Sequence, residues 1–112
     1  MRPFLIAICV AVVFLLSSCL TNKGSFVLIN KAKDTISQGF VTVCGQTIEL
    51  KDIQPNKSMS GTYAVKSDSH YDIKVEFLSG KKISKQLGYV TNGLDFHDEF
   101  VVTDTDIDMK PK

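Results

Sequence analysis

The sequence predicts an all-β protein, a small antiparallel β-sandwich of immunoglobulin-like architecture with about seven strands. Short runs of β-branched and aromatic residues recur over residues 25–109, separated by turn residues roughly every ten positions. Apolar residues at helical spacing are absent from this part. The chain has no Trp, so the resemblance to immunoglobulin domains concerns architecture only. A small closed or half-open barrel is the alternative.

In the first half of the predicted domain, the second and third strands should form a hairpin. Gly39 suggests a bulge in the second strand, and Cys44-Gly45-Gln46 turns the chain into the third. Pro55 lacks an N–H and therefore marks a loop before the fourth. The expected strands are residues 25–30, 36–43, 47–50 and 60–65.

The second half contains the clearest strand, residues 71–77, in which apolar and charged residues alternate strictly. Residues 82–87 should return along it, with 89–91 continuing. Asn92-Gly93 favours a tight turn, and residues 95–99 are expected to be a polar loop. A last strand starts at residue 100 and extends to about 109. The predicted core includes Phe26, Leu28, Ile73, Val75, Phe77 and Val101.

The N-terminus has the pattern of an export signal. Arg2 is followed by an unbroken apolar run, Phe4 to Leu16. This run fits the hydrophobic region of a signal peptide and is shorter than the roughly 20 residues that span a bilayer as a helix. An ordinary secretory signal and an uncleaved N-terminal anchor are the alternatives.

Leu16-Ser17-Ser18-Cys19 closes this run and resembles the lipobox of bacterial lipoproteins. The resemblance implies that signal peptidase II cleaves before Cys19 and that this Cys carries a diacylglycerol group, often with an acylated amino terminus. Two or more acyl chains anchor a protein stably, because each buried CH₂ contributes about 0.8 kcal/mol. The expected organisation is a signal peptide (1–18), a lipidated Cys and short tether (19–24), a β-sandwich (25–109) and a tail (110–112).

The resemblance also implies a place in the bacterial cell envelope. Leu20 follows the lipidated residue, where an Asp would tend to retain a lipoprotein at the inner membrane. In a Gram-negative host we therefore expect an outer-membrane lipoprotein that faces the periplasm. In a Gram-positive host the anchor would lie in the plasma membrane.

Composition argues against nucleic-acid binding. The only Arg is Arg2, which leaves with the signal peptide, and twelve Lys then balance twelve Asp and Glu. Arg is the residue favoured for bidentate recognition of phosphates and bases. Cys44 remains as the lone thiol, expected to be a packed small hydrophobic residue; an intermolecular disulfide is the alternative.

Acidic residues are concentrated near the C-terminus, where residues 95–108 hold six acids and no Lys. A solvated strand face and tail explains this pattern, and an acidic edge that meets a basic partner is the functional interpretation. Asp104 to Asp108 lacks the Gly and Glu of a calcium loop, and a weak divalent-cation site is the alternative to a solvated strand face. Zinc needs three or four converging ligands, and His97 would need His70, which is distant in the sequence but which a sandwich could bring close. The candidate partner-binding residues are Asp95, His97, Asp98, Glu99, Asp104, Asp106 and Asp108.

We expect a non-enzymatic lipoprotein, without cofactor or metal, whose domain binds a protein partner at a sheet face or edge near residues 92–99. No nucleophile elbow or phosphate loop is present. Tyr63, Tyr71 and Tyr89 are candidate contact residues if exposed, although Tyr71 fits the core better. The alternatives are an immunity or inhibitor lipoprotein against an envelope-targeting toxin or hydrolase, and a small metal-dependent hydrolase.

Overall fold

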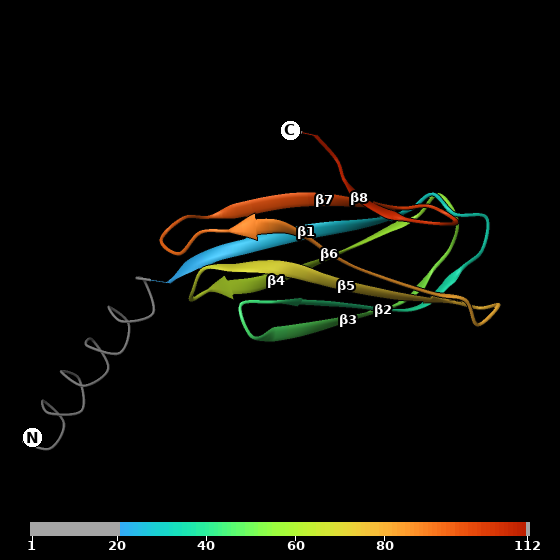
Figure 1. Cartoon of the computed structure of the whole chain (residues 1–112), viewed down its shortest axis with the longest axis horizontal. Coiled ribbons are helices and arrows are strands. Elements are labelled where there is room, and N and C mark those ends of the chain that lie inside the picture. The colour runs from blue at the N-terminus through green and yellow to red at the C-terminus, as the bar shows by residue number, and fades with distance from the viewer. Residues whose placement is uncertain (1–20, 112) are drawn as a thin grey trace, which may run out of the picture.

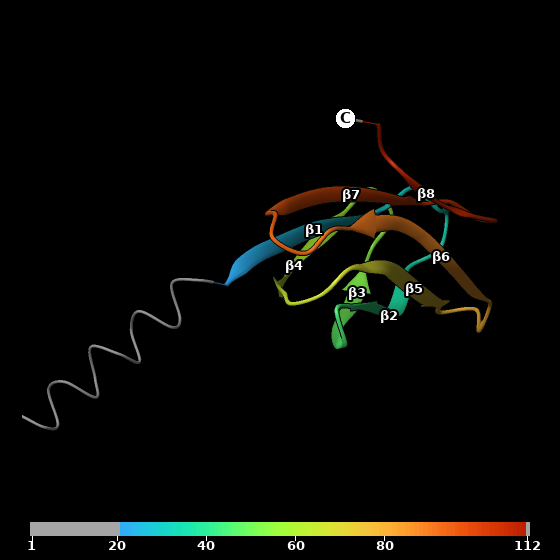
Figure 2. The same cartoon turned by 60° about the vertical axis from the view of Figure 1, so that its left-hand side comes forward.

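The computed structural model describes residues 21–111, which form a sandwich of two four-stranded sheets (Figures 1 and 2). One sheet has the strand order β4-β1-β7-β8 and the other β3-β2-β5-β6. The predicted β-sandwich is confirmed, with eight strands instead of about seven. The strands are β1 (Asn22–Asn30), β2 (Ile36–Val43), β3 (Gln46–Ile53), β4 (Ser58–Val65), β5 (Ser69–Phe77), β6 (Lys82–Val90), β7 (Phe96–Val102) and β8 (Ile107–Met109).

One pair of strands departs from the predicted antiparallel arrangement. β1 and β7 run parallel, with Gly24 opposite Phe96 and Asn30 opposite Val102, whereas the other pairs are antiparallel. β1 also starts at Asn22, so residues 22–24, expected in the tether, belong to the sheet. This part of the chain pairs with the end of β4, where Asn22 lies opposite Val65.

Residues 96–99 form the start of β7, so the polar loop expected over residues 95–99 is wrong beyond Asp95. Phe96, Asp98 and Phe100 alternate with His97 and Glu99, and the buried positions of β7 are Asp98, Phe100 and Val102. This alternation was not recognised in the sequence, because the charged residue Asp98 occupies one of the inward-facing positions. The predicted core position Val101 is wrong, since Val101 is half-buried and its neighbours on either side are buried.

The last predicted strand is interrupted. Residues 103–106 turn, and Thr103 N donates a 2.9 Å hydrogen bond to the carbonyl oxygen of Asp106. β8 then pairs with the end of β7. Asp104 and Asp106 therefore lie in a turn, and of the three alternating aspartates only Asp108 lies on a strand.

Two further local expectations are resolved around β2. The register shift falls between Ile36 and Gln38, and Gly39 is in register with Leu50 and Val75, so the bulge is not at Gly39. Cys44 and Gly45 have φ angles of 51° and 71° and connect β2 to β3 as a two-residue turn. Positive φ at both central residues is the geometry that matches the strand twist in hairpins.

The core fills the space between the sheets with side chains from all eight strands and from adjoining turns. Three aromatic rings meet at its centre, where Tyr71 packs edge-on against Phe26 and Phe100. Tyr63 and Tyr71 are buried and Tyr89 is exposed, so the core assignment of Tyr71 is confirmed. The buried apolar residues are Phe26, Leu28, Ala32, Ile36, Val41, Val43, Cys44, Leu50, Ile53, Tyr63, Val65, Tyr71, Ile73, Val75, Phe77, Val90, Phe100, Val102 and Ile107.

Candidate functional site

The seven predicted partner-binding residues do not lie together on one surface. Asp95 ends the loop before β7, at the end of the sandwich where β1 begins, and Asp104 lies in the turn at the opposite end. Asp98 is 4% exposed and lies in the interior. The acidic segment is therefore divided between two ends, a core position and a sheet edge.

Asp95 is a structural clamp. Its Oδ1 accepts hydrogen bonds from the side-chain amide of Asn22 (3.0 Å) and from Lys23 N (2.9 Å). These donors hold the pKa of Asp95 below its usual range, with the Lys23 backbone N–H as the largest contribution. The clamp ties the β6–β7 loop to the first residues of β1.

Asp98 lies beneath two tyrosines from different sheets. The Tyr71 hydroxyl donates a 2.9 Å hydrogen bond to Asp98 Oδ2, and the Tyr63 and Tyr71 hydroxyls are also hydrogen-bonded to each other. Burial raises the pKa of both phenols. This network satisfies a polar group inside the core and joins β4, β5 and β7.

The remaining acids of the segment have basic or backbone partners. Glu99 pairs with Lys110 at 3.7 Å, and Asp104 Oδ1 accepts a 2.8 Å hydrogen bond from Lys33 N. Asp106 and Asp108 both form ion pairs with Lys85, with Lys85 Nζ 3.1 Å from Asp106 Oδ1 and 3.2 Å from Asp108 Oδ1. Lys85 belongs to β6, so this triad closes one edge of the sandwich between the two sheets.

The Lys85 triad shifts the ionisation of its members in the direction that favours the charged forms. The pKa of Lys85 is raised, chiefly by hydrogen bonds to Asp106 and Asp108. The pKa of Asp106 is lowered, first by the backbone N–H of Ile107 and then by Lys85.

His97 makes a hydrogen bond to a serine. His97 Nδ1 and Ser25 Oγ are 2.7 Å apart on neighbouring strands of the parallel pair. A nucleophilic serine also needs an orienting acid and an oxyanion site.

His70 lies on β5, in the other sheet, where it pairs with Asp72 and Gln86. The two histidines do not converge.

Within residues 21–111, no group of three or more His, Cys, Asp and Glu side chains is arranged to hold a metal ion. The same residues include no helix long and apolar enough to cross a membrane.

The strongest candidate for a binding surface is the outer face of the β3-β2-β5-β6 sheet. Because side chains alternate along each strand, this face carries the residues that the core leaves out. Phe40 belongs neither to the core nor to the partly buried residues packed against it. We call this surface the Phe40 face; around Phe40 it consists of Thr42, Asp72, Lys74, Glu76, Lys82, Ser84 and Gln86.

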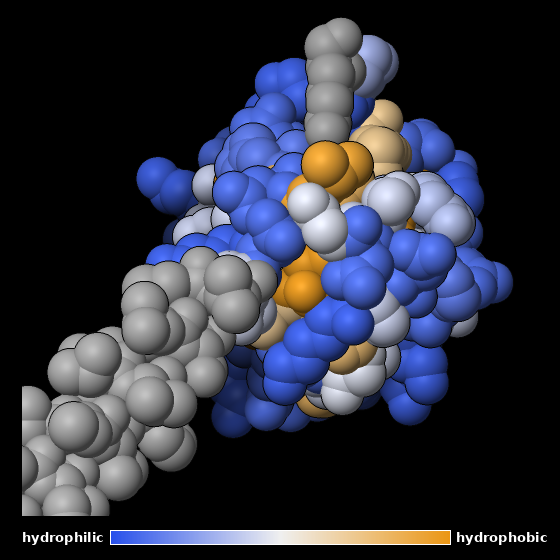
Figure 3. Space-filling view, turned by 90° about the vertical axis from the view of Figure 1, so that its left-hand side faces the viewer, coloured by the Kyte–Doolittle hydropathy of each residue, from blue (hydrophilic) through white to orange (hydrophobic). Residues whose placement is uncertain are grey.

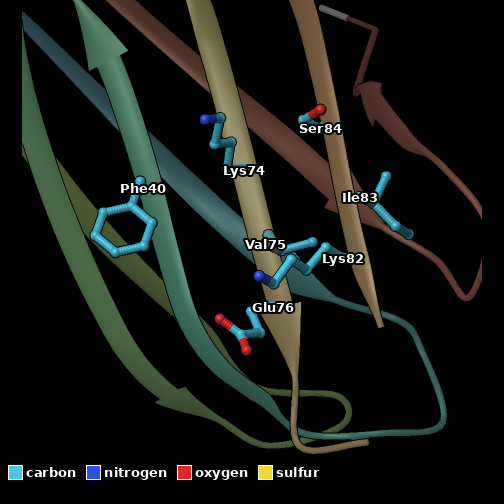
Figure 4. Close-up of a pocket in the computed structure, with 7 residues that line it drawn as sticks. All are labelled: Phe40, Lys74, Val75, Glu76, Lys82, Ile83 and Ser84. Carbon is cyan, nitrogen blue, oxygen red and sulfur yellow. The ribbon is translucent and has the colours of Figure 1, made fainter. Parts of the chain in front are cut away.

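The Phe40 face is hollowed beside the aromatic ring. A cavity of 360 Å³ is lined by Phe40 from β2, by Lys74 and Glu76 from β5, and by Lys82 and Ser84 from β6 (Figure 4). Further hollows adjoin it along β2, β5 and β6. An aromatic ring among side chains of both charges suits recognition of a folded partner, because interface centres are rich in aromatic residues and their rims are polar.

This surface was not predicted from the sequence. The run from residue 40 to 44 is mostly apolar, and in it Val41 and Val43 are buried whereas Phe40 is half-buried on the opposite face. The alternation of Gln38, Phe40 and Thr42 along the strand was the available signal. This signal is weak, because Phe40 interrupts the polar residues on the outer side of the strand.

Comparisons with known proteins support the fold alone. No protein-family model matches the chain, and no curated protein matches it either. Among solved structures, the chain is similar to one described as the NMR structure of a protein from Eubacterium rectale, with a TM-score of 0.57 and 16% sequence identity. The match covers 81% of this chain and 87% of that one. At this identity the similarity extends to the β-fold and not to activity.

Proposed function

We propose that the protein is a bacterial lipoprotein, anchored through lipid on Cys19, whose β-sandwich binds a protein partner through the Phe40 face without catalysing a reaction. The observation that carries this proposal is the position of Phe40. The exposed part of an aromatic side chain outside the core costs solvation free energy in the isolated domain. Covering the half-buried Phe40 with a partner would recover part of the about 1.5–3 kcal/mol that burying a fully exposed Phe contributes. Its place beside a hollow makes it the natural contact centre.

The anchor is supported by the sequence and by where the domain begins. The lipobox-like Leu16-Ser17-Ser18-Cys19 and the apolar run before it lie outside the described residues. β1 begins at Asn22, only three residues after Cys19. A lipidated Cys19 therefore holds the sandwich directly against the membrane, in the cell envelope and, in a Gram-negative host, at the periplasmic face of the outer membrane.

A protein partner fits the Phe40 face better than a nucleic acid or a polyanion. Its lysines, Lys74 and Lys82, are interleaved with Glu76 and Asp72 across neighbouring strands. Glu76 lies opposite Lys82 in the register. Such a balanced surface gives specificity through complementary charges rather than general attraction to phosphate.

The test is affinity purification of the full-length, membrane-anchored protein after cross-linking in its own envelope. Wild type is compared with Phe40→Ser and with Val27→Ser, which changes a half-buried, outward residue on a central strand of the other sheet. We expect the wild type and Val27→Ser to retain one stoichiometric partner. Phe40→Ser should lose it by about 30-fold or more in affinity, as expected for a hot-spot residue.

The identity of the partner decides between classes of accessory function. A toxin or hydrolase would make the protein an immunity or inhibitor lipoprotein, and an assembly or secretion complex would make it an accessory subunit. Equal recovery of the partner with Phe40→Ser would move the interface off the Phe40 face. Absence of any specific partner would refute the binding function.

A further inference from the structure

A large apolar side chain is exposed at the end of the sandwich where the chain enters from the anchor. Leu94 lies in the β6–β7 loop and is 56% exposed. Tyr89, at the end of β6 that leads into this loop, is 64% exposed. Figure 3 looks onto this end, where a small group of hydrophobic residues lies within a mostly hydrophilic surface. Exposed leucine is common by itself, so its position is what carries the inference.

The β6–β7 loop is held in place on both sides of Leu94. The neighbouring Asp95 accepts the hydrogen bonds from Asn22 and from Lys23 N. On the other side, Asn92 N donates a 2.8 Å hydrogen bond to Asp68 Oδ1 in the β4–β5 connection. Leu94 is therefore fixed relative to Asn22, the first residue of β1.

The distance from this loop to the proposed anchor is short. Asn22 is the third residue after Cys19, and three extended residue steps span about 10 Å. A lipidated Cys19 lies within the membrane surface, so the clamped loop lies within roughly two headgroup layers of it, each about 5–7 Å thick. An exposed leucine at this distance from acyl chains gains free energy by entering them.

We propose that Leu94 inserts into the lipid surface that holds Cys19 and so forms a second contact that orients the domain. This inference rests on the proposed lipid anchor. Tyr89 suits the headgroup region, where tyrosine is favoured. With two contacts the strands stand away from the membrane, since β1 runs from the anchored end to the opposite end (Figure 1). The Phe40 face then points sideways, where a partner in the envelope can reach it.

The experiment places a fluorescent probe at position 94 of the full-length, lipidated protein. Leu94→Cys and, as a matched control, Leu78→Cys are each made with Cys44→Ala and labelled with a nitrobenzoxadiazole fluorophore. Leu78 is 67% exposed and lies in the β5–β6 turn at the opposite end. Both proteins are reconstituted into vesicles of phosphatidylethanolamine and phosphatidylglycerol, with and without lipids brominated on their acyl chains.

Membrane insertion predicts a blue-shifted emission at position 94 that brominated lipid quenches, and an aqueous, unquenched emission at position 78. Equal, aqueous emission at both positions in a lipidated protein would overturn the insertion of Leu94 and leave the anchor intact. Quenching at position 78 alone would overturn it as well, by placing the opposite end on the membrane. Absence of palmitate incorporation into the protein would instead refute the anchor and the insertion together.

Discussion

The Tyr71 hydroxyl donates a 2.9 Å hydrogen bond to the buried carboxylate of Asp98 and thereby links the two sheets through the core. Tyr71 is fully buried and its ring packs against Phe100 at a centroid distance of 4.7 Å. A carboxylate at this depth is tolerated only with donors close by, because an unsatisfied buried charge is costly. The phenol therefore stabilises both the packing and the charge.

Removing this hydroxyl should destabilise the domain. We expect Tyr71→Phe to lower the free energy of unfolding by about 1–3 kcal/mol, since it deletes a donor to a buried acceptor while keeping the ring. Urea unfolding of residues 20–112, followed by circular dichroism, measures this. Tyr89→Phe is the matched control and should leave the midpoint unchanged, because Tyr89 is exposed. Equal midpoints for both variants would mean that the hydrogen bond does not contribute.

Acid should destabilise the fold by protonating aspartates that accept backbone hydrogen bonds. Backbone donors lower the pKa of Asp34, Asp95 and Asp106 in the folded state. A lowered folded pKa contributes stability above the unfolded value of about 3.9, and this contribution disappears as the pH falls through that value and below. Denaturation midpoints measured from pH 7 to pH 2.5 should therefore decline below about pH 4.

The Asp95→Asn variant isolates one of these groups. Asn retains an oxygen that can accept from Lys23 N but carries no charge. Its stability should fall below that of the wild type at pH 7, and the difference should shrink at low pH, where Asp95 is protonated. A constant difference across the pH series would attribute the effect to packing and not to the charge.

Close approach between β1 and a buried ring requires glycine at position 24. A Cβ built on Gly24 would lie 2.1 Å from Tyr63 Cζ, far inside van der Waals contact. Gly24→Ala should therefore destabilise the domain by about 1–3 kcal/mol or prevent folding. Gly39→Ala is the matched control, because a Cβ there meets Leu28 Cδ2 at 3.4 Å. Thermal unfolding of the two variants should separate them clearly.

Cys44 should be unreactive in the folded protein. It is 8% exposed, and its thiol donates a 3.4 Å hydrogen bond to the carbonyl oxygen of Ser67. In residues 20–112 it is the only thiol, so labelling with a thiol-specific reagent reports on it directly. We expect slow labelling in buffer and complete labelling in denaturant. Rapid labelling of the native domain would support the alternative of an intermolecular disulfide.

Lipid attachment should depend on one residue. Cys19→Ser should abolish palmitate incorporation and cleavage of the signal peptide, and it should release the protein from stable membrane association. Metabolic labelling with palmitate followed by electrophoresis tests this. Labelling of Cys19→Ser at the wild-type level would exclude this residue as the lipidation site.

Much of the fold was predictable because strands leave a local signature. The alternation over residues 71–77 identified β5 and its buried face. Asn92-Gly93 marked the connection before β7, and the turn at Cys44-Gly45 joined β2 to β3. The start of β7 was missed, because Asp98 occupies an inward position that apolar patterning assigns to a hydrophobic residue.

The candidate site was less predictable. The concentration of acids in residues 95–108 suggested one surface, yet β7, the following turn and β8 divide them between the core, both ends and the edge at Lys85. Phe40 lies in a mostly apolar run, and its outward position was not predicted. A clear alternation of apolar and polar residues shows which side of a strand faces the partner sheet, and the alternation in β2 is weakened by Phe40 on its outer side.

The sequence by itself determined an all-β domain, its approximate strands and turns, and a lipobox-like motif, because each depends on residues adjacent in the chain. Only the tertiary structure decided that β1 and β7 pair in parallel, that Asp98 is buried under Tyr71, and that Asp95 clamps the β6–β7 loop beside the first residues of β1. These relationships join residues 27 to 73 positions apart. Their free energies arise when distant strands meet, so no local pattern reports them.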